Sequence, residues 1–503
     1  MTHKKYNQFR FGAILSYLAI AVNIFWGIVY TPWMIDTIGQ SDYGLYTLAN
    51  SLISLFLIDV GLGTAASRYI AKYRAENREE LIPGLLSAVY KLYLIIDAVI
   101  LTALMILFFS IDAIYVNLTA SELTRFKVVF AIAGVYSIIS FPCTTFNGIL
   151  NAYEQFIPLK VADMVQRIGS VLLTIAALWM GLGLYSLVVI QAASGCIANL
   201  IKLNYVQRLT AFRFTKHDRG IYRAIFNISF WSCIYGLAQR LIFNIIPTIL
   251  AMTVPDASKA IAVFGVVSTI EGYCYIFTTA INGMFLSKIS RILQKSNSEK
   301  ELNTLAINVG RFQFALNGLI VLGFAQIGKE FLYLWMGPGF ELAYYGVLFV
   351  TIPGLFFNAL QIFNTTMIAR DMVKDQALIQ IAMGILNVIL SFVFSHIWGV
   401  VGATLSIFVA YCFRVVMTLV LIRKKLKMDI ALYIKNCYLR MGAAVLLTGI
   451  ISSFFLQYIG DGSWLLFFIK VMVIVMVYCI TQITIGLSRH ERKLMRYKFL
   501  HTK

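Results

Sequence analysis

Residues 400–427 read VVGATLSIFVAYCFRVVMTLVLIRKKLK, a long apolar run that ends directly in a basic cluster. An apolar run of about 20 residues is long enough to cross the hydrocarbon core as a helix and too long for a barrel strand. Basic residues that follow a span are typical of its cytoplasmic end. The stretch therefore predicts a membrane-spanning helix that ends in the cytoplasm.

The composition extends this prediction to the whole chain. Of the 503 residues, 60% are hydrophobic and only 13% are charged, and the mean hydropathy is +0.80. A soluble domain carries about 25% charged residues, so this chain has too little polar surface to cover a water-soluble globule. Because a span must satisfy its backbone hydrogen bonds internally, we expect an all-α integral membrane protein.

The apolar runs predict fourteen helices, an even number, which places both termini on one side of the membrane. Their ranges are 12–35, 43–67, 84–109, 126–150, 164–182, 184–204, 225–252, 261–286, 305–330, 341–368, 377–397, 399–421, 439–459 and 464–487. We expect an N-terminal six-helix bundle over 1–207, a cytoplasmic inter-bundle loop over 208–224 and a C-terminal six-helix bundle over 225–421. Accessory helices 13 and 14 follow in 422–488, and a basic cytoplasmic tail occupies 489–503.

Basic residues are sorted along the chain into every second gap between the apolar runs. The chain has 42 Lys and Arg, and the opposite gaps hold only Arg125, Lys127, Lys259 and Lys329. This asymmetry predicts that both termini lie in the cytoplasm. The net charge of +19 is then explained by orientation and by attraction to anionic membrane lipids, and no nucleic-acid partner is expected.

The two predicted bundles show a faint repeat. Phe11 and Pro32 in the first helix correspond to Phe226 and Pro247 in the seventh. A parallel pseudo-repeat around a central cavity is one of the known transporter plans. Chance placement of a proline near a helix end is the alternative.

Ionisable side chains deep in a span are costly and usually face a cavity or a charged partner. Arg240 lies about 18 Å and Glu271 about 15 Å from the outer ends of adjacent predicted helices, at about 1.5 Å per residue. Arg240 and Glu271 are therefore candidate substrate-binding residues of a cavity, and a structural ion pair between them is the alternative.

Four further ionisable residues are candidates of the same kind. Asp59 lies deep in the second predicted helix and Arg68 at its inner end, where Arg68 could instead simply end the helix. Asp97 in the third helix and Arg414 in the twelfth are secondary candidates. The acidic groups could instead be protonated and hydrogen-bonded to neighbouring helices, and Arg414 could serve packing.

The chain contains no pattern that indicates catalysis or a bound cofactor. The seven cysteines are scattered without a CxxC pair, so neither a disulfide nor a metal site is expected. No HExxH and no GxxxxGK[ST] motif occurs, and the glycines Gly61 and Gly63 lie inside an apolar run with no strand before them. The sequence therefore predicts that the protein is not an enzyme and uses no cofactor.

One segment resembles a known family. Residues 31–76 contain a GQSDYGLY turn at 39–46, DVGLG at 59–63 and the RYIAKYR exit that starts at Arg68. These elements, with the weaker FNGILNAYEQF at 146–156 and GKEFLYLWMG at 328–337, are similar to the polysaccharide-transport flippases of the multidrug/oligosaccharidyl-lipid/polysaccharide (MOP) superfamily, which carry O-antigen and capsular repeat units.

The resemblance implies two six-helix bundles that face a central cavity lined by helices 1, 2, 7 and 8. It also implies translocation of undecaprenyl-diphosphate-linked oligosaccharide from the inner to the outer leaflet of the bacterial cytoplasmic membrane, with a proton or a sodium ion as a coupling ion. Membrane lipids, a polysaccharide polymerase and the assembly machinery are the expected partners. A cation-coupled multidrug exporter of the same superfamily and a polysaccharide polymerase or ligase are the alternatives.

Overall fold

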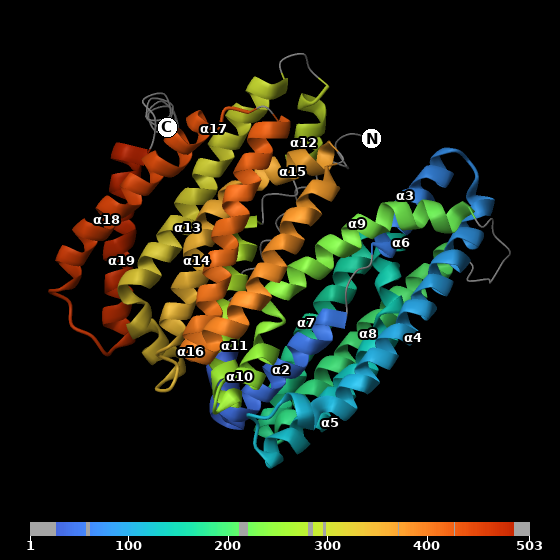
Figure 1. Cartoon of the computed structure of the whole chain (residues 1–503), viewed down its shortest axis with the longest axis horizontal. Coiled ribbons are helices and arrows are strands. Elements are labelled where there is room, and N and C mark those ends of the chain that lie inside the picture. Colours follow the sequence, from blue (N-terminus) through green and yellow to red (C-terminus); the bar gives the residue numbers. More distant parts are fainter. Residues whose placement is uncertain are drawn as a thin grey trace. The chain divides into compact units, whose positions relative to one another are not determined.

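The computed structural model describes residues 27–56, 61–210, 220–279, 285–294, 298–370, 372–426 and 428–486, and in these ranges the secondary structure is helical throughout (Figure 1). The chain forms two compact units. Unit 1 comprises residues 1–28, 266–379 and 404–503, and unit 2 comprises residues 29–265 and 380–403. The predicted boundaries of the two six-helix bundles stay a prediction.

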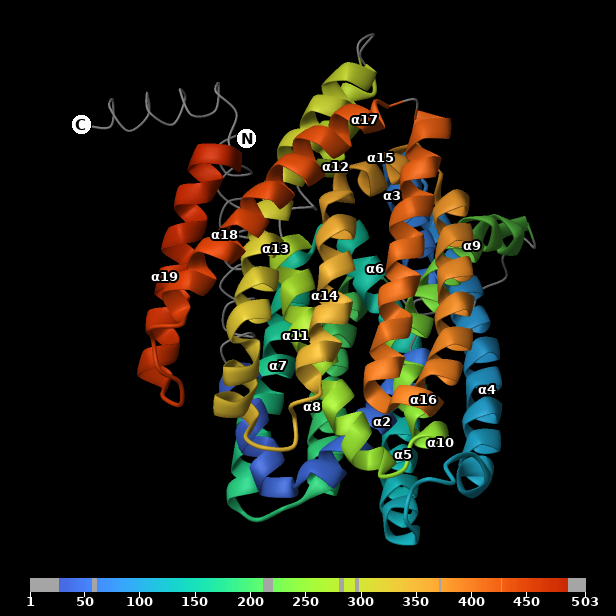
Figure 2. The same ribbon diagram turned by 60° about the vertical axis from the view of Figure 1, so that its left-hand side comes forward.

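Unit 2 is built mainly from the N-terminal half of the chain. Its helices are α2 (Gln40–Phe56), α3 (Leu62–Ala75), α4 (Ile82–Ile114), α5 (Ala120–Ser140), α6 (Thr145–Ala152), α7 (Phe156–Trp179), α8 (Leu184–Leu209), α9 (Gly220–Phe243) and α10 (Ile246–Thr253). Short 3-10 turns precede α4 and α6. Within this unit α4, α5 and α8 lie side by side (Figures 1 and 2), and α7 packs along α8.

Unit 1 holds most of the C-terminal half. Its helices are α12 (Phe285–Ile292), α13 (Ser298–Met336), α14 (Ala343–Ala359), α15 (Gln361–Ala369), α17 (Ile430–Tyr433), α18 (Arg440–Leu456) and α19 (Trp464–Thr481). Three π-helical turns, η4 (Ile422–Leu426), η5 (Ile434–Leu439) and η6 (Gln482–Gly486), extend or precede these helices. Two helices, α11 (Ala257–Thr279) and α16 (Val373–Leu421), belong partly to each unit.

Several expected helices are broken, and the breaks have identifiable causes. The second helix was expected to run from 43 to 67, but α2 ends at Phe56 and α3 begins after Gly61 and continues to Ala75. Gly61 has φ +75°, which favours glycine, and a Cβ there would lie 3.0 Å from Cα of Ser229. Gly399, with φ 57° and ψ −134°, kinks α16 between the two helices that the sequence predicts at 377–397 and 399–421.

The two predicted accessory helices pack within unit 1 on the long helix α13, beside which α18 and α19 lie in Figures 1 and 2. Tyr478 Oη donates a hydrogen bond of 2.6 Å to the carbonyl of Ala315. Gln326 Nε2 donates one of 2.8 Å to the carbonyl of Gly449. These bonds join side chains to helix backbone, so they fix both helices at defined positions along α13.

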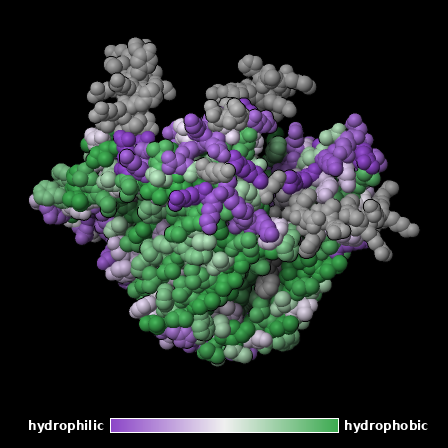
Figure 3. Space-filling model, turned by 45° about the horizontal axis from the view of Figure 1, so that its top comes forward, coloured by the Kyte–Doolittle hydropathy of each residue, from purple (hydrophilic) through white to green (hydrophobic). Residues whose placement is uncertain are grey.

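The surface confirms a multi-pass membrane protein. Among the described residues, nine helices are long and apolar enough to span a membrane, or eleven if two bent pairs are each one span. Large apolar side chains such as Phe109, Leu446 and Ile450 are 76%, 71% and 71% exposed. On the face drawn in Figure 3, hydrophobic side chains form broad continuous areas with hydrophilic ones at their margin. The all-α fold is thus confirmed, while the count of fourteen spans stays a prediction.

We expect Gly148→Ala to destabilise unit 2. Gly148 lies on α6, where a Cβ would overlap the carbonyl oxygen of Gly63 on α3. Overpacking of this kind destabilises by about 1–3 kcal/mol, which thermal unfolding of the purified protein in detergent would measure. Gly169→Ala on α7 is the matched control, because a Cβ there meets nothing within 4 Å. Equal stability of the two variants would contradict the close approach of α3 and α6.

Candidate functional site

Arg240 lies in the middle of a broken span of unit 2. Residues Ser229–Phe243 of α9 and Ile246–Thr253 of α10 pass the membrane test together and are bent by 41°. The Arg240 side chain is exposed in the structure, and within the described part of unit 2 its guanidinium forms no hydrogen bond or ion pair. The N–H groups of the Arg240 guanidinium are therefore available to a ligand near the middle of the span.

A buried amide holds the break next to Arg240. The last carbonyls of a helix lack intrahelical donors, and Nδ2 of Asn387 on α16 donates to the carbonyls of Leu241 and Ile242 at 3.2 and 3.1 Å. Asn387 is fully buried. Pro247 lies at the start of α10, where its missing N–H breaks no hydrogen bond. The local structure thus fixes the backbone that carries Arg240.

Glu271 lies on α11, fourteen residues after its first residue, in the part of that helix that belongs to unit 1. Its side chain is half-buried, and in the described part of unit 1 no hydrogen bond or ion pair holds its carboxyl group. Arg240 belongs to unit 2, so the expected proximity of the two residues stays a prediction.

The other candidates have different surroundings. Arg68 lies on α3 with an exposed side chain, and Asp59 lies outside the described residues. Asp97 is 8% exposed in the middle of α4, and its Oδ1 has no hydrogen-bond partner among the residues that the structure describes.

Arg414 packs in the interior of unit 1. It is 8% exposed, and its Cζ lies 3.5 Å from the ring centroid of Phe357 on α14. A guanidinium over an aromatic ring is a stabilising cation–π contact. This geometry agrees with the packing alternative for Arg414.

Sequence reasoning missed a buried ion pair in unit 2. Nζ of Lys202 on α8 lies 2.9 Å from Oδ1 of Asp163 on α7, and the Lys202 side chain is only 8% exposed. The sequence predicts a helix over 184–204 that contains Lys202, and α8 extends that helix to Leu209, but the sequence gives no sign that Asp163 on α7 is its partner. Because Asp163 compensates its charge, Lys202 is less available to an anion than Arg240.

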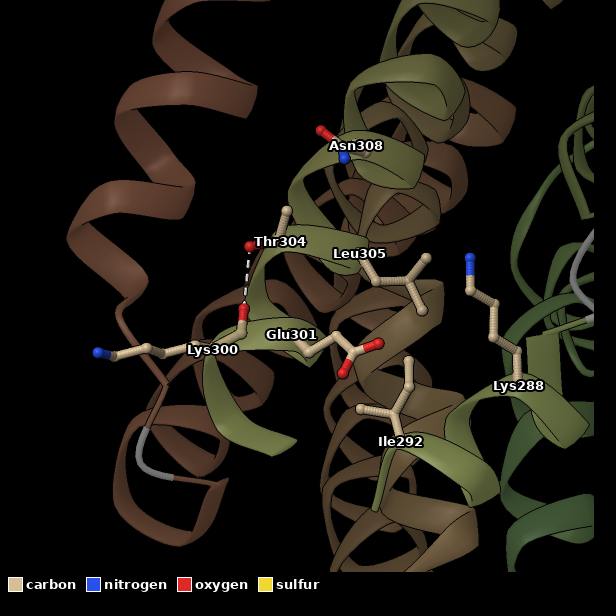
Figure 4. A pocket seen from close by; sticks show the side chains of 7 residues that line it. All are labelled: Lys288, Ile292, Lys300, Glu301, Thr304, Leu305 and Asn308. Carbon is tan, nitrogen blue, oxygen red and sulfur yellow. Dashed lines mark hydrogen bonds between the residues drawn. The ribbon is translucent and has the colours of Figure 1, made fainter. Parts of the chain in front are cut away.

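Unit 1 contains a pocket of about 400 Å³ between α12 and α13. It is lined by Lys288, Ile292, Lys300, Glu301, Thr304, Leu305 and Asn308. Figure 4 shows that Lys300 extends away from Lys288, while the Glu301 carboxylate lies between them. The lining is therefore of mixed charge and does not form a cationic cradle.

Comparison with known proteins places the chain in a family. The family model described as "polysaccharide biosynthesis protein" matches residues 11–281, more than half of the chain. The uncharacterized membrane protein EpsK of Bacillus subtilis (strain 168) is 21% identical over 406 residues, which cover 77% of each chain.

Solved structures show the fold. The lipid II flippase MurJ in an inward closed conformation matches with a TM-score of 0.72 at 14% identity, covering 93% of this chain and 98% of that one. An inward-facing multidrug resistance MATE family transporter of the MOP superfamily matches with a TM-score of 0.65 at 14% identity, covering 80% and 97%. The chain therefore belongs to the polysaccharide biosynthesis protein family and has the fold shared by MurJ and the MATE transporters, as its resemblance to MOP flippases led us to expect.

Proposed function

We propose that the protein is a flippase that moves an undecaprenyl-diphosphate-linked oligosaccharide from the inner to the outer leaflet of the bacterial cytoplasmic membrane by alternating access. The observation that carries this proposal is the match to 98% of the length of a lipid II flippase by a chain of the polysaccharide biosynthesis protein family. The named relative moves a lipid-linked precursor, and the family supplies the polysaccharide context.

The physical problem of the reaction is the polar head of the lipid. A glycan and a diphosphate cannot enter hydrocarbon without a large loss of hydration free energy. A cavity between two helix bundles gives them a hydrated path while the polyprenyl tail stays in the bilayer. Arg240 is our choice for the contact with the diphosphate, because a guanidinium binds phosphate oxygens through two parallel hydrogen bonds.

The other candidates take supporting roles in this scheme. Arg68, exposed on α3 at the predicted inner side, would attract the anionic head before it enters. Glu271 or Asp59 would hold Arg240 in the empty carrier or bind the coupling proton or sodium ion. Asp97, buried without a partner for Oδ1 among the described residues, is a further candidate for a proton.

The membrane potential favours outward movement. With the cytoplasm negative, moving about two negative charges outward at 100 mV gains roughly 4–5 kcal/mol, at about 2.3 kcal/mol per charge. The return of the empty carrier then limits the cycle, and a cation that binds the acidic residues would assist it.

The direct test is flipping in vesicles that contain the purified protein. A fluorescent oligosaccharide on a short polyprenyl diphosphate is placed in one leaflet, and its appearance in the other is followed by periodate oxidation of the newly accessible sugar. We expect protein-dependent flipping of the diphosphate and much slower flipping of the same glycan on an uncharged polyprenyl anchor.

Two other outcomes would reject the proposal. Export of cationic dyes without flipping of the lipid diphosphate would identify a multidrug exporter. Elongation of the supplied glycan in the same vesicles would identify a polymerase.

A further inference from the structure

Three helices of unit 2 meet at the carboxylate of Glu122. Glu122 lies in the first turn of α5, and its Oε1 accepts hydrogen bonds of 2.6 Å from Ser41 Oγ at the start of α2 and from Ser258 Oγ at the start of α11. Its Oε2 accepts from the backbone N–H and the hydroxyl of Thr119, both at 2.9 Å. One carboxylate thus ties together the ends of α2, α5 and α11.

A second polar contact reinforces the same junction. Nη1 of Arg125, one turn further along α5, donates to Oδ1 of Asp42 at 2.6 Å. The Asp42 side chain is 15% exposed and the Arg125 side chain 36%. We call the five residues Ser41, Asp42, Glu122, Arg125 and Ser258 the outer latch, since the basic-residue asymmetry assigns this end of the helices to the outer side.

The backbones of α2 and α11 approach closely at the outer latch. Gly44 on α2 faces the carbonyl of Ser258, and a Cβ on Gly44 would overlap that carbonyl. Helix contacts through small residues bring backbones together and permit shifts between helices, and two turns further along α11 the buried ring of Tyr43 packs against Gly265. The remaining contacts are hydroxyl and guanidinium hydrogen bonds to carboxylates, which water can replace when the helices part.

The outer latch includes a residue of α11, a helix that belongs partly to each unit. Ser258 is the second residue of α11 and is 3% exposed, whereas residues from 266 onward in the same helix belong to unit 1. Ser258 thus lies at the outer end of a helix that continues into unit 1 and carries Glu271, so a movement of that end of α11 would be passed along the helix.

We propose that the outer latch, centred on Glu122, is the contact that closes the transport path on the outer side and that must open before the substrate can leave. The proposal rests on the alternating access of the proposed function. It also gives a role to the GQSDYGLY segment, which forms the start of α2 rather than the turn expected from the sequence. Ser41 and Asp42 each contribute a hydrogen bond, and Gly44 leaves room for the carbonyl of Ser258.

A crosslink tests whether the latch must open. Both hydroxyls lie 2.6 Å from the same Glu122 oxygen, so they are at most twice that distance apart, and we expect the two thiols of the Ser41→Cys/Ser258→Cys variant to form a disulfide on oxidation. We expect oxidation with copper phenanthroline to reduce flipping at least tenfold and a reductant to restore it. The two single-cysteine variants, treated in the same way, control for the seven native cysteines. Undiminished flipping by the fully crosslinked protein would overturn the proposal.

A second measurement does not depend on transport. The Ser258→Cys thiol should be nearly closed to a water-soluble maleimide. Adding Glu122→Gln should raise its labelling rate several-fold, because the amide has only one acceptor oxygen and cannot accept both from Ser41 and from the N–H and hydroxyl of Thr119. Lys127→Gln is the matched control, because Lys127 lies on the same helix and pairs only with the exposed Asp112. An unchanged labelling rate would show that Glu122 does not hold the latch. Because this readout needs no substrate, it separates failure of the latch from failure of the flippase assignment.

Discussion

Arg240→Ala should abolish most flipping of the lipid diphosphate while leaving the protein folded. The guanidinium has no hydrogen bond or ion pair within the described part of unit 2, so its removal breaks no contact that holds that unit together. A hydrogen bond to a charged group contributes about 1.5–3 kcal/mol, which corresponds to a loss of about 10- to 100-fold in apparent affinity. Flipping rates in vesicles over a range of lipid concentrations would measure the loss.

Two further variants make the result specific. Arg240→Lys keeps the charge but loses the two-pronged geometry, so we expect intermediate activity. Arg208→Ala is the matched control, because Arg208 is an exposed arginine of the same unit whose guanidinium lies 5.6 Å from the Tyr205 ring. Equal activity of the Arg240→Ala and Arg208→Ala variants would remove Arg240 from the site.

The same variant separates the two interpretations of Arg240 and Glu271. If the residues form a structural pair, each single alanine substitution leaves an uncompensated charge in the membrane, and the double substitution recovers thermal stability. If Arg240 serves the substrate, the double variant stays inactive whatever its stability. Comparing stability and flipping in all three variants therefore decides between them.

The apolar runs predicted the all-α membrane fold well, because the bilayer requires an apolar helix wherever the chain crosses it. The orientation that the basic residues predict stays a prediction. The apolar runs could not predict where a span breaks. The predicted second helix ran through Gly61, whose φ of +75° is set by its close approach to Ser229 on α9, far away in the sequence. Local hydropathy contains no information about that contact.

The candidate site was predicted only as a set of unusual residues. A charged residue inside an apolar run is visible in the sequence, which is why Arg240, Glu271, Asp97 and Arg414 were found. The surroundings of such a residue depend on which side of its helix faces the neighbouring helices. Arg414 lies over the ring of Phe357, whereas Arg240 is exposed. Lys202 lies inside the predicted helix 184–204, but its contact with Asp163 on α7 depends on how the two helices pack, which the sequence does not show.

Glu122 was missed for a different reason. Thr119 and Glu122 form a capping box, both halves of which are present in the structure, and the T-x-x-E spacing is a recognised signature of a helix start. The capping box explains the hydrogen bonds to Oε2 of Glu122 but does not predict any partner for Oε1. Only the fold brings Ser41 and Ser258, 81 and 136 residues away, onto Oε1.

The second large effect is expected at Lys470, which anchors α19 to α13. Its side chain is 4% exposed, its Nζ lies 2.7 Å from Oε2 of Glu330, which is 11% exposed, and it also contacts the exposed Asp461. Lys470→Met leaves the buried Glu330 carboxylate without a charged partner, with the N–H of Gly462 at 3.2 Å still donating to its Oε1. Loss of one partner of a buried ion pair costs about 3–5 kcal/mol. We expect a strong loss of thermal stability and faster proteolysis between α18 and α19.

The exposed ion pair of Lys425 and Asp375 in the same unit is the matched control, and it tests whether burial or pairing alone makes the Lys470 contact important. Lys425 lies 2.6 Å from Oδ1 of Asp375, but its side chain is 51% exposed, so Lys425→Met should change stability by at most about 1 kcal/mol. Adding Glu330→Leu to Lys470→Met removes the orphaned charge and should restore much of the stability, because an apolar pair of similar volume replaces a buried ion pair at little loss. If the double variant were as unstable as the single one, the loss would lie in packing around the Lys470 stem, and the anchoring of α19 would be apolar.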